Sequence, residues 1–163
     1  MSPAPDLDQQ ARDVLDSIRY VVLSTVDQDG RTRTSPVFFT PHRYADLYWV
    51  SYADTHHSRN LAHDGRVSGV VFDSTRPPPE TTAVYLTGTA REVPAGELAD
   101  HLPHAFDPDR RGGRRFSAEE LTDPDDALRL WVLHVDRCEV HVRAGDPERG
   151  TGQDRRVEVD PRG

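Results

Sequence analysis

The stretch Ser51–Asp73, SYADTHHSRNLAHDGRVSGVVFD, decides how the rest of the chain is organised. One apolar run, residues 46–51, ends here, and a second, residues 67–72, begins after about one helical turn. The polar turn between them carries five possible donors: His56, His57, Ser58, Arg59 and Asn60. Neutral donors, a planar guanidinium and the free N–H groups of a helical first turn suit an anionic group. The same turn also fits a surface cap of a short helix, with Thr55 or Ser58 as the N-cap, so residue types alone leave both interpretations open.

Composition restricts the class of protein. The chain has 163 residues with a net charge of −8, and 35% of them are hydrophobic, as expected for one soluble domain. All 20 basic residues are arginine and none forms a basic stripe, which argues against nucleic acid as a partner and excludes a Schiff-base lysine. Cys138 is the only cysteine, so neither an intrachain disulfide nor a cysteine zinc site can form. No run approaches the roughly 18 apolar residues of a membrane span, and we expect a cytoplasmic protein without a membrane partner.

Hydrophobic periodicity predicts mainly strands. An apolar run, an Asp27–Gly30 turn and a second extended run predict a hairpin, in which Pro36 marks an edge or a bulge because proline cannot donate to a ladder. Gly88 predicts a bulge or a close approach in a long strand. Short connections between the early strands favour a small antiparallel barrel over a parallel α/β sheet. The expected strands are 20–26, 32–40, 47–52, 67–72, 82–93 and one or two within 128–142, with helices at 6–18, after strand 47–52, at 94–105 and from Ser117.

The expected domain spans residues 6–143, between a flexible N-terminal tail, 1–5, and a polar C-terminal tail, 144–163. Within it, three kinds of chemistry are conceivable. Pairs of histidines such as His101 and His104 lack a carboxylate at the spacing of a catalytic metal motif, so we predict no metal site. Ser35 and Ser58 lack the nucleophile elbow of a hydrolase. Aromatic residues near the polar turn suit a planar ring with a phosphorylated tail, although plain core packing of Trp49 and its neighbours is the alternative.

Three blocks of the sequence carry a family resemblance. In chain order they are LSTVDQDGRTRTSPVFF, LYWVSYADTHHSRNLAHDGRVSGVVFD and AVYLTGTAREV. Together they resemble the pyridoxamine 5′-phosphate oxidase-like family of flavin- and deazaflavin-dependent split-barrel proteins. The resemblance covers about residues 13–94 well and 128–142 more loosely. It implies a mainly β fold, a split β-barrel of about six antiparallel strands of Greek-key type with a few flanking helices, which forms a homodimer with the cofactor at the interface.

The resemblance also implies cofactor-binding residues. FMN, or alternatively a deazaflavin, would lie along the backbone of the second strand and against the end of the third strand and the turn that follows. The matching positions here are Ser35, Pro36, Val37, Trp49, Val50, Ser51, His56, His57, Ser58, Arg59 and Asn60. Many members carry lysine where this chain has His57, so a phosphate would depend on Arg59, the histidines and helix N–H groups.

The implied function is that of an oxidoreductase acting on a small organic molecule by hydride or electron transfer. The flavin supplies that chemistry, so no catalytic residue is assigned. Oxidation of pyridoxamine phosphate itself is not expected, because the C-terminal substrate motif is not visible in residues 128–142. The alternative is a non-enzymatic flavin- or haem-binding protein on the same barrel.

Overall fold

The computed structural model describes residues 6–77, 80–106 and 113–163, and the predicted N-terminal tail, 1–5, lies outside them. The described part contains eight strands, one or two more than the sequence suggested. The helices are α1 (Leu7–Ser17), α2 (His56–His63), the short 3-10 helix η2 (Ala95–Glu97), α3 (Leu98–Ala105) and α4 (Ala118–Thr122). The strands are β1 (Tyr20–Val26), β2 (Thr32–Phe38), β3 (Thr40–His42), β4 (Asp46–Tyr52), β5 (Arg66–Phe72), β6 (Ala83–Glu92), β7 (Leu128–Val142) and β8 (Arg155–Val159).

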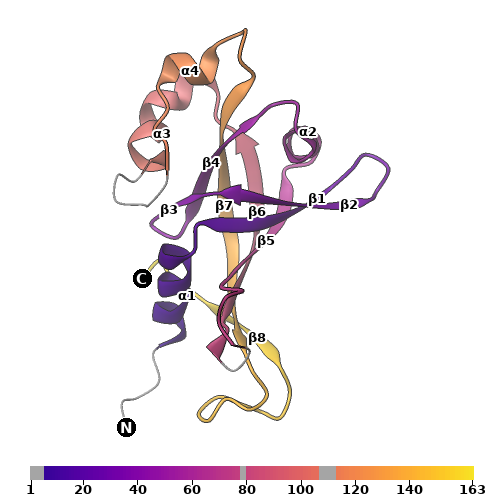
Figure 1. Cartoon of the computed structure of the whole chain (residues 1–163), viewed down its shortest axis with the longest axis vertical. Helices are drawn as coiled ribbons and strands as arrows, with labels where there is room; N and C mark the ends of the chain where they lie inside the picture. The colour runs from indigo at the N-terminus through magenta and orange to yellow at the C-terminus, as the bar shows by residue number, and fades with distance from the viewer. Residues whose placement is uncertain (1–5, 78–79, 107–112) are drawn as a thin grey trace.

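The strands form one antiparallel sheet in the order β2-β1-β5-β6-β7-β4-β3, with β8 added beside β7. The sheet curls into a split β-barrel, and β2 and β3, at its two ends, follow each other along the chain (Figure 1). The predicted hairpin is present, and Gly30 turns it with a φ of 85°. Pro36 lies on β2, an end strand of the sheet, and pairs with Val22 of β1, which confirms the prediction that proline marks an edge.

The predicted bulge is also present. The register of β6 against β7 shifts between Thr87 and Gly88, and a Cβ on Gly88 would lie 2.0 Å from the carbonyl oxygen of His134. Only glycine permits such a close backbone approach, and the bulge bends the long strands around the core.

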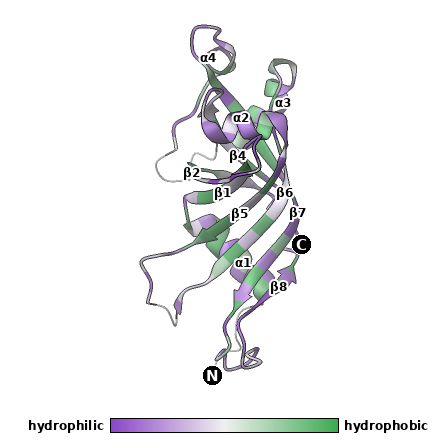
Figure 2. Ribbon diagram, turned by 90° about the vertical axis from the view of Figure 1, so that its right-hand side faces the viewer, coloured by the Kyte–Doolittle hydropathy of each residue, from purple (hydrophilic) through white to green (hydrophobic). Residues whose placement is uncertain are grey.

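Alternation along the strands divides the buried residues into two clusters. On β4, Leu47 and Trp49 face the barrel interior, while Tyr48 packs with α3 and α4 on the outer side. Figure 2 shows the alternation of hydrophobic and hydrophilic positions along the strands. The interior cluster is closed by α1, whose Ala11 and Leu15 are fully buried. The sheet is therefore apolar on both faces in the region where α3 and α4 cover its outer face.

The predicted polar tail, 144–163, is not detached from the domain. It contains β8, which pairs Val157 with Val140 of β7. Beyond β8 the chain reaches α1, where Arg12 donates to the carbonyl oxygen of Pro161 at 3.1 Å. The sequence did not anticipate this strand, because only two sizeable apolar side chains mark it. No helix in the described ranges is long and apolar enough to cross a membrane.

Candidate functional site

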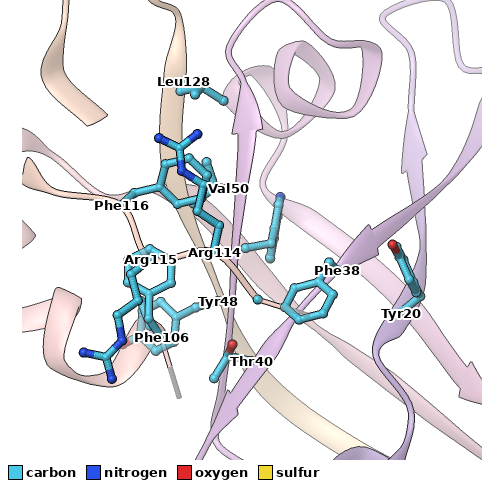
Figure 3. Close-up of a pocket in the computed structure, with 13 residues that line it drawn as sticks. Tyr20, Phe38, Thr40, Tyr48, Val50, Phe106, Arg114, Arg115, Phe116 and Leu128 are labelled. Atoms are coloured by element: carbon cyan, nitrogen blue, oxygen red, sulfur yellow. The ribbon is translucent and has the colours of Figure 1, made fainter. Parts of the chain in front are cut away.

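A cavity of about 490 Å³ lies where the barrel is split, and residues from both faces of β4 line it. Its sheet wall comes from the ends of β1 and β2 and from β3 and β4, and Figure 3 shows Phe38 and Tyr20 on the side opposite Val50. Its helical wall comes from the end of α3 and the segment before α4. The lining residues are Tyr20, Phe38, Thr40, Tyr48, Trp49, Val50, Ala105, Phe106, Gly113, Arg114, Arg115, Phe116 and Leu128. The volume suits a ring-bearing small molecule.

The helical wall combines two aromatic rings with two cations. The rings of Phe106 and Phe116 lie 5.8 Å apart between centroids, and the guanidinium of Arg114 lies 4.6 Å from the centroid of Phe116. Arg114 also forms an ion pair with Glu120. Glu120 belongs to a capping box at the start of α4, because it accepts from the backbone N–H of Ser117 at 2.8 Å. The wall is therefore fixed to the start of a helix.

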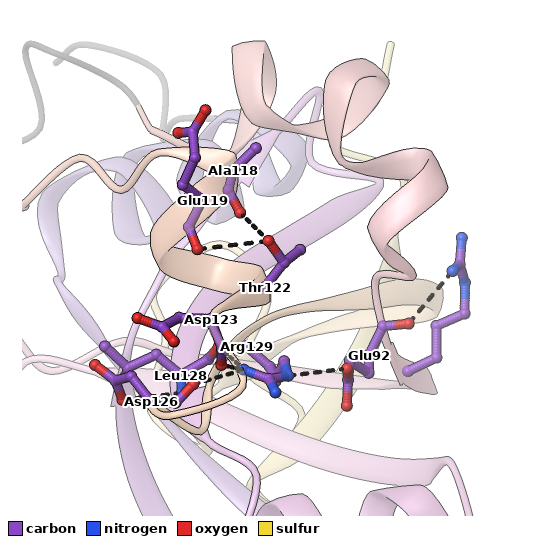
Figure 4. Close-up of polar contacts among 9 residues, drawn as sticks. Glu92, Ala118, Glu119, Thr122, Asp123, Asp126, Leu128 and Arg129 are labelled. Atoms are coloured by element: carbon purple, nitrogen blue, oxygen red, sulfur yellow. Dashed lines mark hydrogen bonds and ion pairs between the residues drawn. The ribbon is translucent and has the colours of Figure 1, made fainter.

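Arg129 anchors the opposite end of α4 to the sheet (Figure 4). Its guanidinium donates to the carbonyl oxygens of Asp126, at 2.9 Å, and Leu128, at 2.6 Å. The same group lies 3.6 Å from the carboxylate of Glu92 at the end of β6. These contacts hold the loop between α4 and β7 against the sheet beside the cavity.

Histidines attach α3 to the sheet. Nδ1 of His101 lies 2.9 Å from the hydroxyl of Tyr48, and the rings of His104 and His42 stack with centroids 4.0 Å apart. Burial raises the pKa of Tyr48 to about 12, so this hydroxyl keeps its proton at neutral pH. Burial, followed by the charge of His104, lowers the pKa of His42. The Tyr48–His101 and His42–His104 pairs are structural contacts of the cavity wall.

The polar turn lies beside the cavity, because Trp49 lines it and Ser51, on the same face of β4, contacts α2. Nε2 of His57 lies 2.9 Å from the Ser51 hydroxyl and 3.3 Å from the Thr55 hydroxyl. Thr55 is the N-cap, as one of the two sequence interpretations predicted, and accepts from the backbone N–H of Ser58 at 3.4 Å. Burial lowers the pKa of His57, which favours its neutral form.

Two of the predicted ligand residues turn inward. Ser58 is fully buried, and its hydroxyl accepts from Thr55 at 2.8 Å. The amide of Asn60 donates to Thr25 at 3.1 Å and to the carboxylate of Asp27 at 2.8 Å. Hydrogen bonds from Arg33 and then Asn60 lower the pKa of Asp27. On α2, the exposed members of the predicted set are His56 and Arg59, and Arg59 donates to the carbonyl oxygen of Asp54.

On β2, the predicted residues divide between the core and the surface. Val37 is buried in the interior cluster, Ser35 is half-buried, and Pro36 is exposed. None of the three lines the cavity, whereas the following residue, Phe38, does. The strand nevertheless lies against β4 and α2, so the predicted segments are neighbours in space.

The structure therefore brings Trp49 and Val50 to the cavity, and joins Ser51 to the turn of His57 and Ser58 beside it. Sequence reasoning did not identify the helical wall. The pair Phe106 and Phe116 flanking arginines was the available signal. No cluster of three or more histidine, cysteine or acidic side chains in the described residues could hold a metal ion.

Two indole N–H groups inside the barrel lack acceptors. Trp49 and Trp131 are cross-strand partners, 2% and 1% exposed, with near-parallel rings 6.4 Å apart between centroids. Neither Nε1 has a hydrogen-bond partner among the described residues. An unpaired buried donor is costly, and of the two residues only Trp49 lines the cavity.

The sequence pattern of one protein family matches residues 7–141, nearly the whole sheet, and its description is pyridoxamine 5′-phosphate oxidase. The chain belongs to the pyridoxamine 5′-phosphate oxidase family. Among curated proteins, no sequence matches it.

Solved structures share the fold at low identity. A heme binding protein from Mycobacterium smegmatis is 22% identical with a TM-score of 0.67, and the match covers 96% of this chain and 60% of that one. A FAD-binding protein from Mesorhizobium loti is 18% identical with a TM-score of 0.59, over 81% and 91% of the two chains. A general stress protein 26-related protein from Clostridium acetobutylicum is 11% identical with a TM-score of 0.64, over 96% of each chain. This chain thus spans about 60% of the length of the Mycobacterium protein.

Proposed function

We propose that this protein binds a flavin, FMN or alternatively a deazaflavin, and acts as an oxidoreductase on a small organic molecule. Family membership supports this, and the observation that carries it is the continuity of one surface. Trp49 lines the cavity, Ser51 follows it on the same face of β4, and the Ser51 hydroxyl lies 2.9 Å from Nε2 of His57 in the first turn of α2. A planar ring in the cavity with a phosphorylated tail along β4 follows that surface.

The residues fit such a group in two ways. The orphaned Trp49 N–H and the Thr40 hydroxyl, which also lines the cavity, are neutral donors for the acceptor edge of a ring. Arg59 and His56 are the exposed donors of α2 for an anionic tail. Ser58 and Asn60, already bonded within the protein, would act by holding the helix that presents those donors.

A bound flavin supplies hydride or electron transfer, and the chain contributes position and exclusion of water. No carboxylate or histidine of the described residues lines the cavity, and the Tyr48 hydroxyl is engaged with His101. The aromatic side chains fix the plane of a ring, and the helical wall covers it. The proposed cofactor residues remain the segment 35–37 on β2, Trp49, Val50 and Ser51 on β4, and residues 56–60 on α2.

We also propose a homodimer with the cofactor at its interface. Tyr20, at the edge of the cavity, is 55% exposed, and its ring contacts Phe38 edge-on with centroids 5.9 Å apart. Tyr52, Val26 and Phe72 are also exposed. A second copy would cover these apolar side chains. Sedimentation velocity at micromolar concentration tests this, and a monomer under those conditions would refute it.

The second candidate is a non-enzymatic flavin or haem carrier. The fold likeness to a heme binding protein favours it, but in the described residues no histidine lines the cavity to ligate iron. Titration of the purified protein with FMN, a deazaflavin and haemin, followed by absorption spectra, separates these ligands. Reduction of bound flavin by NADPH and reoxidation by a quinone supports the enzyme. No flavin binding at micromolar concentration contradicts the proposal.

A further inference from the structure

The two walls of the cavity differ in charge. The sheet wall is neutral, whereas the helical wall contributes Arg114 and Arg115, and no acidic side chain in the described residues lines the cavity. This local excess of positive charge occurs in a chain with a net charge of −8. A positive, partly apolar concavity favours an anionic ligand with an apolar body.

The two arginines are held differently. Arg114 is positioned over Phe116 and paired with Glu120, so part of its charge is already balanced. Arg115 has no acidic partner in the described part of the chain. Figure 3 shows Arg114 near Val50 and Leu128, and Arg115 beside Phe106. A guanidinium beside an aromatic ring can pair with a carboxylate while the ring stacks on the remainder of the same molecule.

We propose that the helical wall, formed by Phe106, Phe116, Arg114 and Arg115, binds an aromatic carboxylate as the substrate of the flavin site. This rests on the proposed function, because the sheet wall is assigned there to the cofactor ring. The rings of Phe106 and Phe116 contact the aromatic body, and Arg115 pairs with the carboxylate. Arg114 contributes less positive charge than Arg115, because Glu120 balances part of it.

The test compares 2-naphthoate with 2-naphthalenemethanol, which has the same rings and no charge. Calorimetric titration is done with the protein alone and with the protein saturated with FMN. We expect naphthoate to bind at least ten times more tightly than the alcohol in both forms. Equal affinities for the two compounds would overturn the proposal, because the arginines would then not contribute to binding. Displacement of naphthoate by FMN would also overturn it, because the cofactor alone would then occupy the cavity.

Three variants identify the residues. Arg115→Gln should weaken naphthoate binding at least fivefold and leave the alcohol unchanged. Glu120→Gln keeps a side-chain oxygen that can accept from the Ser117 N–H, but it removes the negative charge that pairs with Arg114. Naphthoate should therefore bind more tightly to this variant. General damage to the fold cannot produce a gain in affinity. Arg137→Gln removes an exposed arginine that pairs with Glu158, far from the lining residues, and should change nothing. An equal effect of Arg115→Gln and Arg137→Gln would contradict the assignment.

The same titrations distinguish a failure of the anion site from a failure of the proposed flavin binding. If FMN does not bind but naphthoate discrimination persists and depends on Arg115, the flavin assignment is wrong and the anion site stands. If FMN binds and naphthoate does not discriminate, the flavin assignment stands and the anion site is wrong.

Discussion

The amide of Asn60 donates to the carboxylate of Asp27 at 2.8 Å and thereby ties the middle of α2 to the end of β1. Asn60 is 7% exposed, and the same nitrogen donates to Thr25. Asn60, which the sequence suggested as a cofactor ligand, therefore also holds α2 in place. The Asn60 side chain thus fastens α2 to the hairpin β1–β2.

Replacement of Asn60 by alanine should destabilise the fold. It leaves the buried Thr25 hydroxyl without its donor, and a lost buried hydrogen bond of this kind costs about 1–3 kcal/mol. Urea unfolding with an unchanged m-value measures the difference. Asn60→Asp, which sets a second carboxylate against Asp27, should be worse than alanine. If both variants unfold at the wild-type midpoint, the support role is wrong.

The bulge at Gly88 predicts a strong glycine requirement. A Cβ there would lie 2.0 Å from the His134 carbonyl oxygen, a backbone atom that can yield only if β6 and β7 separate. Gly88→Ala should therefore lower the free energy of unfolding by about 1–3 kcal/mol, as overpacking does. Gly96→Ala is the matched control, because nothing lies within 4 Å of its Cβ position. Equal melting temperatures of the two variants would contradict the account of the bulge.

The strands and the bulge could be predicted because their signals are local. The alternation of β4 and the Asp27–Gly30 turn specify pairing between neighbours, and Gly88 stands alone within a long apolar run. β8 could not be predicted, because only Val157 and Val159 mark it as apolar side chains in a polar stretch. Val157 meets Val140, and the guanidinium of Arg156 lies 3.7 Å from the ring centroid of Tyr85 on β6.

The candidate site was predicted only in part, for a related reason. Sequence shows which residues are donors, but not that the cap at Thr55 and the carboxylate of Asp27 engage Ser58 and Asn60. The helical wall arises from a tertiary contact, since Phe116 meets Phe106 only after the chain returns from α3. The orphaned indole of Trp49 likewise appears only once the barrel is built.

The buried His57 predicts acid sensitivity. Burial lowers its pKa, so the unfolded chain binds the proton more readily than the folded one. Its contribution to stability is therefore complete above the unfolded value of about 6.5 and declines as the pH falls below that value. His42, whose pKa is also lowered, acts in the same direction. His57→Gln should reduce, without abolishing, the loss of stability between about pH 7 and pH 5. Parallel pH profiles of variant and wild type would exclude a role for His57.

Trp49 and Trp131 give a paired test of the cavity. Both carry an unpaired buried N–H, and both are almost fully buried, but only Trp49 lines the cavity. Replacement by phenylalanine removes the donor and shrinks the ring equally at the two positions. If a ligand acceptor pairs with the Trp49 N–H, Trp49→Phe should weaken FMN binding by roughly fivefold, the equivalent of one net hydrogen bond of about 1 kcal/mol. Trp131→Phe should leave FMN affinity within twofold of wild type, as measured by flavin fluorescence quenching. If the two variants lose affinity equally, the loss comes from the repacked barrel, and the indole of Trp49 is no part of the flavin site.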